Sequence, residues 1–127
     1  MASNIGDWMV GEIIDTLMIA TQTPHIALHT AAVGDDGTGT EVAGDTYVRL
    51  PMAMDAEAAR GTANTAAEEW AEAGAEWGTV GWVGIWDALT AGNLIAWGAV
   101  TTAKLITVGD TAIIAIGALT LTFTPTP

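Results

Sequence analysis

Residues 79–86 read Thr-Val-Gly-Trp-Val-Gly-Ile-Trp, an uninterrupted run without charge or proline. Its period of two predicts a β-strand, in which Val80, Trp82, Gly84 and Trp86 share one face. Residues 90–93, Thr-Ala-Gly-Asn, follow as a turn, and residues 94–100 form the next apolar run. The stretch therefore predicts two successive strands joined by a turn.

Further strands are predicted on both sides of this stretch. Downstream they are residues 105–108 and 111–123, separated by a turn at Gly109-Asp110, with Gly117 as a bulge in the last strand. Upstream they are residues 25–30, with Ile26 and Leu28 on one face, and residues 46–54, where Pro51 favours an edge or bulge. Short strands at this spacing predict a mainly β chain, an antiparallel β-sandwich or jelly-roll-like domain.

One amphipathic helix is predicted at the N-terminus, over residues 4–21, with Asn4 as N-cap and a stop before Pro24. Spacings of three and four favour a packing face, with Asp7, Gly11 and Asp15 opposite it. We expect this face to cover the sheet, at odds of roughly two to one over docking on a partner. The face consists of Ile5, Trp8, Met9, Ile13, Leu17 and Ala20.

Residues 55–76 are rich in Ala and Glu and fit two structures. Helix propensity alone favours a short helix over residues 65–73, ended by Gly74. We expect one domain over residues 1–127, with the helix at 4–21, a sandwich over 25–123 and an extended tail at 124–127.

Composition excludes several classes of function. The 127 residues carry 15 acidic side chains against three basic ones, a net charge of −12, and no cysteine. Such acidity argues against binding nucleic acid or anionic membranes, which requires a basic surface. Missing cysteine fits assembly in a reducing host cytoplasm, and no segment reads as a signal peptide or membrane span. The acidity itself favours adaptation to high salt slightly over selection for solubility.

Few residues could act in catalysis or bind a metal ion. We therefore expect no enzyme, no catalytic residue, no cofactor and no metal. His25 and His29 would lie roughly 13 Å apart on a strand, too far for one metal ion. The acidic loop at 34–41 lacks calcium-loop spacing, although a looser cation site remains an alternative. The glutamates at 68, 69, 72 and 76 lack the framework of a glycosidase cleft, and Ser3 is the single serine.

Six tryptophans are many for one small domain. Trp82 and Trp86 are expected in the core. One or two of the others are expected to anchor a subunit interface, where tryptophan is enriched, and Trp8 and Trp70 are the candidates.

Ordered motifs along nearly the whole chain resemble a family of small tailed-phage virion proteins, described as tail fibre or head decoration (cement) proteins. The resemblance implies an N-terminal helix, an antiparallel β-sandwich, a homotrimer and an extended chain around Trp70, which we prefer to the helix at 65–73. The motifs are IALHTAA at 26–32, GTEV at 39–42, Gly44, YVR at 47–49, WGTV at 77–80, GIWDA at 84–88, GNL at 92–94, WGA at 97–99, GDT at 109–111 and GALTL at 117–121.

The function expected from these observations is structural. The first hypothesis is a capsid decoration protein on the virion head that bridges major capsid subunits; the alternative is a tail or tail-fibre component that contacts the host surface. Expected partners are other copies of the chain and major capsid or tail proteins. The candidate contacts are Trp8, Trp70, the loop residues Asp35, Asp36, Thr38 and Glu41, and the tail residues Pro125 and Pro127.

Overall fold

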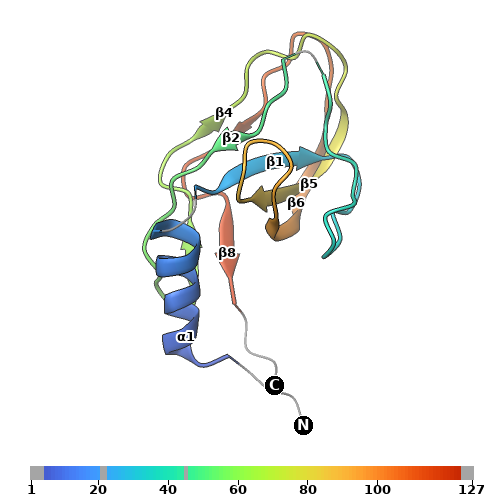
Figure 1. The fold of residues 1–127 in the computed structure, drawn as a ribbon. Coiled ribbons are helices and arrows are strands. Elements are labelled where there is room, and N and C mark those ends of the chain that lie inside the picture. Colours follow the sequence, from blue (N-terminus) through green and yellow to red (C-terminus); the bar gives the residue numbers. More distant parts are fainter. Residues whose placement is uncertain (1–4, 21–22, 45, 124–127) are drawn as a thin grey trace.

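The fold is mainly β, with antiparallel pairing and one N-terminal helix, as the sequence predicts (Figure 1). The computed structural model describes residues 5–20, 23–44 and 46–123. Its elements are α1 (Asp7–Gly11), a π-helical continuation (Glu12–Ala20), β1 (His25–His29), β2 (Leu50–Pro51), β3 (Gly61–Ala63), β4 (Glu68–Glu69), β5 (Gly78–Trp86), β6 (Leu94–Ile106), β7 (Ile113–Ile114) and β8 (Thr120–Thr122).

One four-stranded sheet, in the order β2-β1-β5-β6, organises the molecule, and two short ribbons, β3-β8 and β4-β7, complete it. Ile26 pairs with Ile85 and Leu28 with Val83, so these four apolar side chains share one face. The helix and the ribbons pack on that face, where Val10, Ile14 and Trp70 join the same buried cluster. The other face carries a smaller cluster of Ala27, Val33 and Trp86, closed by the loop after β1. The arrangement is sandwich-like.

A bulge in the β5–β6 hairpin changes the face of one predicted core residue. The pairing Trp82–Ala99 is followed by Val80–Lys104, so residues 100–103 of β6 bulge opposite Gly81. Val80 consequently joins the main core while Trp82 and Trp86 pack on the opposite face. The prediction that Val80 shares a face with both tryptophans is wrong for this reason.

The helix buries a different face from the predicted one. It begins at Asp7 with Gly6 at the N-cap, and Asn4 lies outside the described residues. Val10, Ile14 and Met18 are buried at intervals of four, which suits the wider turn of a π-helix. The expected stripe is largely solvent-facing, with exposed side chains at Ile5, Trp8, Met9, Leu17 and Ala20 and a half-buried one at Ile13.

Several strand boundaries also differ. Within the range predicted as one strand over 46–54, only Leu50–Pro51 forms a strand, and Met54 adds an isolated bridge to Asn64. The strand predicted over 111–123 is divided into β7 and β8. Gly117, with φ of 72°, lies in the turn between them, where Ala118 N–H donates to the Ala115 carbonyl at 3.0 Å. β6 is continuous where two strands were predicted, and residues around Trp70 are extended, as the resemblance implied. No helix among the described residues is long and apolar enough to cross a membrane.

Candidate assembly surface

Arg49 holds together the ends of two loops on one side of the sheet. Its Nε and Nη2 donate to the two carboxylate oxygens of Glu41, each at 2.9 Å. Its Nη1 donates to the carbonyls of Ala88 (3.0 Å) and Ala91 (2.8 Å), and its guanidinium lies 4.3 Å from the ring centre of Trp86. This arginine is buried and fully engaged, so it stabilises the loops and offers nothing to a ligand.

Glu41 belongs to the same cluster, so its carboxylate is already engaged by side chains of its own copy. Burial alone would raise the pKa of Glu41, but the hydrogen bonds from Arg49 and Tyr47 outweigh it and lower that pKa. Tyr47 accepts from the Leu28 amide at 3.0 Å, and burial raises the pKa of its hydroxyl. The cluster keeps a charged, half-buried carboxylate paired with the buried Arg49.

His29 is fully buried against this cluster. Its Nδ1 lies 3.0 Å from the Gly39 carbonyl and therefore donates to it, and its ring stacks on Trp86 with 6.2 Å between centroids. Burial lowers the pKa of His29, because the charged ring would lose its hydration. Its Nε2 has no hydrogen-bond partner among the described residues. No group of three or more metal-ligating side chains occurs within the described part of the chain.

The loop at 34–41 is confirmed as a loop, and its polar residues mostly bond within the chain. Asp35 accepts a hydrogen bond from Trp97 Nε1 at 2.9 Å. Asp36 accepts from the hydroxyl (2.8 Å) and amide (3.2 Å) of Thr38, and these bonds lower the pKa of Asp36. Asp35, Asp36 and Thr38 remain solvent-exposed, so this part of the loop keeps an accessible polar surface.

The two tryptophans proposed as anchors have opposite environments. Trp70 is 1% exposed and its Nε1 donates to the Val48 carbonyl at 2.9 Å. Within one copy it is therefore a core residue, and its role as an interface anchor stays a prediction. Trp8 is 73% exposed, so it remains accessible to a partner. Pro125 and Pro127 lie outside the described residues.

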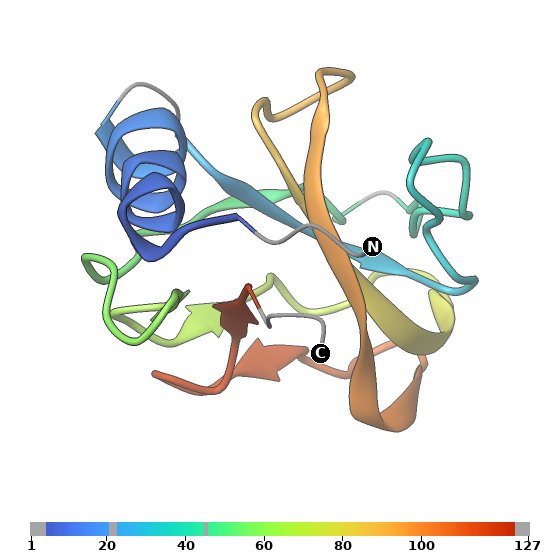
Figure 2. The same cartoon turned by 90° about the horizontal axis from the view of Figure 1, so that it is seen from below.

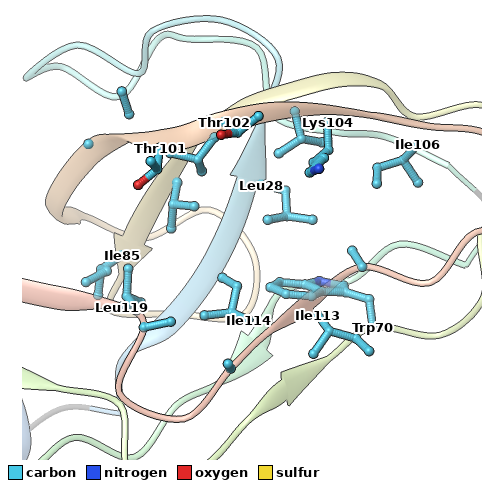
Figure 3. Close-up of a pocket in the computed structure, with 18 of the residues that line it drawn as sticks. Leu28, Trp70, Ile85, Thr101, Thr102, Lys104, Ile106, Ile113, Ile114 and Leu119 are labelled. Carbon is cyan, nitrogen blue, oxygen red and sulfur yellow. The ribbon is translucent and has the colours of Figure 1, made fainter.

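An open apolar cleft of about 880 Å³ lies between β6 and the segment 110–121 (Figure 3). Leu28, Ile85 and Trp70 contribute to its lining, together with Ile114 and Leu119 from the C-terminal segment. Figure 2 shows this segment, in red, beside the long orange strand β6. The volume lies within the range of small-molecule pockets, but the cleft is open and bounded by a strand edge.

Small side chains on β6 explain the cleft. Gly98 pairs with Val83 and Ala96 with Ile85, so β6 presents little volume to the face on which β5 carries large apolar residues. Residues 100–102 of the bulge also line the cleft, and no described strand pairs with the outer edge of β6.

Lys104 is a basic residue at this cleft that sequence reasoning missed, and the acidic residue Asp110, which accepts hydrogen bonds from Thr107, also lines the cleft. It pairs with the buried Val80 across the hairpin, which places both on the cleft side of the sheet. Arg49 pairs with Glu41 and Arg60 with Asp7, whereas Lys104 forms no ion pair with any described residue. Its isolation in a chain with three basic residues was the available signal.

Comparisons with known proteins agree with a structural role. Residues 2–122 match the family described as podophage GP4 fiber I protein gp80. A search of curated protein sequences found no match.

Proposed function

Because the chain belongs to the family described as podophage GP4 fiber I protein gp80, a phage virion structural family, we propose that it is a fibre subunit that works by assembling with copies of itself. The fibre role fits the description of this family better than the head decoration role expected first. Assembly as a homotrimer, attached to other tail proteins, completes the proposal.

The observation that carries self-assembly is the combination of an open apolar cleft and a 13-residue strand whose outer edge no described strand covers. An apolar groove rimmed by polar residues is a kind of surface on which a second molecule can pack. Leu105 and Ile113 line this cleft with exposed apolar side chains, and Trp8 is a separate exposed apolar residue on the helix. A structural subunit needs contacts of this kind and no reactive group.

Head decoration stays a second candidate, since the fold and the surface serve a capsid contact equally well. Its mechanism would be cross-linking of neighbouring capsid subunits, with contact area summed over many copies. The two locations predict different distributions on the particle.

Immunogold labelling of intact virions with antibody to this chain separates them. We expect label on the tail or its fibres. Label spread over the head would replace the fibre role by decoration, and absence of label from purified particles would refute a virion role altogether. Light scattering on the purified chain should give three times the mass of one copy.

A further inference from the structure

We propose that the cleft of one copy receives the Trp8 face of α1 from a second copy, with Glu12 of the incoming helix placed near Lys104. This inference rests on the proposed self-assembly and deepens it by naming the two surfaces that meet. One surface is the exposed helix face of Trp8, Met9 and Glu12; the other is the cleft beside β6.

The exposed helix face presents side chains that can insert into a cleft. Trp8 lies two residues from Val10, about 200° around the helix, so it points away from the core into which Val10 packs. Met9 beside it is 44% exposed, and Glu12 follows Trp8 by one turn on the same face. Tryptophan is the residue type most often found as an interface anchor, because it buries a large apolar area with few rotatable bonds.

The cleft has space for such side chains. Ala96 and Gly98 leave space over Val83 and Ile85, and Trp70 lies within the same hollow (Figure 3). The helix of the same copy does not fill it, since Trp8 is 73% exposed, and Figure 2 shows α1 apart from β6.

A strand from another molecule is the less suitable occupant. Edge strands are protected against pairing by bulges and by lysine, and β6 has both. Residues 100–103 bulge, and Lys104 follows directly. Side chains can enter the cleft without using the backbone edge, whereas an added strand would have to match a distorted one.

Charge complementarity selects a second copy as the partner. The helix carries Asp7, Glu12 and Asp15 and no basic residue between 5 and 20. Glu12 is exposed and accepts a hydrogen bond from Thr16 at 3.3 Å. Lys104 has no acidic partner among the described residues of its own copy. An acidic helix entering the cleft would supply one.

Such a contact joins two different surfaces, so it is a head-to-tail interface. Each copy gives its helix to one neighbour and its cleft to another, which produces a closed ring or an open filament according to the rotation between copies. Both forms require every copy to present both surfaces.

Disulfide cross-linking between single-cysteine chains tests the contact, because the natural chain has no cysteine. One chain carries Met9→Cys and retains Trp8; the other carries Thr101→Cys on the cleft side of the bulge. Mild oxidation of the mixture should give disulfide-linked heterodimers. A mixture of Met9→Cys with Val108→Cys, an exposed residue outside the cleft, should give at least tenfold less.

Adding Trp8→Ala to the Met9→Cys chain should reduce cross-linking and weaken association about 30-fold or more. Val108→Ala is the matched control, and circular dichroism checks that both variants fold. Glu12→Lys or Lys104→Glu alone should weaken association, and mixing those two variant chains should restore it in part.

If the wild-type chain forms oligomers but the Met9→Cys and Thr101→Cys chains do not cross-link, this interface is wrong. Self-assembly and the fibre role would remain intact. A wild-type chain that stays monomeric at 100 micromolar or higher would overturn the interface and the self-assembly together. Location on the virion is then decided by the labelling experiment alone.

Discussion

Replacing Arg49 by methionine is predicted to destabilise the protein by about 3 kcal/mol, at the low end of the cost of breaking a buried ion pair. Methionine keeps the apolar stem but removes four hydrogen bonds, two to Glu41 and two to loop carbonyls. Glu41 would retain one hydrogen bond, from Tyr47 at 2.9 Å. Its side chain is 27% exposed, so water can reach the carboxylate, and this limits the loss.

The assay is urea denaturation followed by tryptophan fluorescence, at one fixed protein concentration because assembly would shift the midpoint. A loss of this size corresponds to a melting temperature lower by about 10 °C. The control is Arg60→Met, whose partner Asp7 is 86% exposed and needs no buried counter-charge. It should cost clearly less.

A double variant tests the cause. Glu41→Gln removes the charge that Arg49→Met leaves unpaired, so the double variant should be more stable than Arg49→Met by about 1–2 kcal/mol. An Arg49→Met protein within 1 kcal/mol of the wild type would refute this reasoning. So would a double variant whose loss is the sum of the two single losses.

Three further predictions concern pH, salt and one tight turn. Because burial lowers the pKa of His29 below its ordinary 6.5, the unfolded chain binds the proton first, so the free energy of unfolding should fall as pH drops below about 6.5. Urea midpoints between pH 8 and 5 should show this slope, weakened in His29→Gln and retained in His25→Gln. The net charge of −12 should make the melting temperature rise from millimolar to molar salt, and an unchanged value would reject salt adaptation. Gly39→Ala would place a Cβ 2.1 Å from the Ala32 carbonyl oxygen and should cost about 2–3 kcal/mol by denaturation, whereas Gly6→Ala, with open space around it, should cost about half a kcal/mol or less.

The strand run at 79–86 and the alternation at 25–30 could be predicted because local period and burial agree there. Ile26 and Leu28 pack where the pattern places them. Val80 was misplaced because the pattern assumes an unbroken strand, and the bulge opposite Gly81 arises from pairing with a segment more than twenty residues away.

The helix shows a second limit. A period of 3.6 chose the face of Trp8 and Met9, whereas α1 buries Val10 and its π-helical continuation buries Ile14 and Met18. Sequence alone also cannot tell which of two apolar faces meets the core of its own chain. One apolar face of the helix packs on the core of its own chain and the other is exposed. The alternative that the helix docks on a partner therefore applies to the exposed face.

The candidate site could be predicted only in part, because the cleft depends on space that neighbouring side chains do not fill. Trp8 and Trp70 were both identified from their residue type, but that Trp70 is buried and donates its N–H to Val48 within one copy could not be predicted from sequence. The cleft results from Ala96 and Gly98 facing Val83 and Ile85, a match that requires the register of β5 with β6.

The strong acidity and the proposed contact place opposite demands on the surface of one chain. A net charge of −12 opposes association of copies at any surface where carboxylates face one another. At physiological ionic strength charges separated by more than about 8 Å are largely screened, so repulsion acts mainly within the contact. Lys104 lies in the cleft without an ion-pair partner among the described residues, whereas Asp110, which also lines the cleft, accepts hydrogen bonds from Thr107. Lys104 is therefore the point in the cleft at which an acidic helix would meet attraction. The acidity that discourages contact elsewhere would then favour one orientation of the next copy over all others.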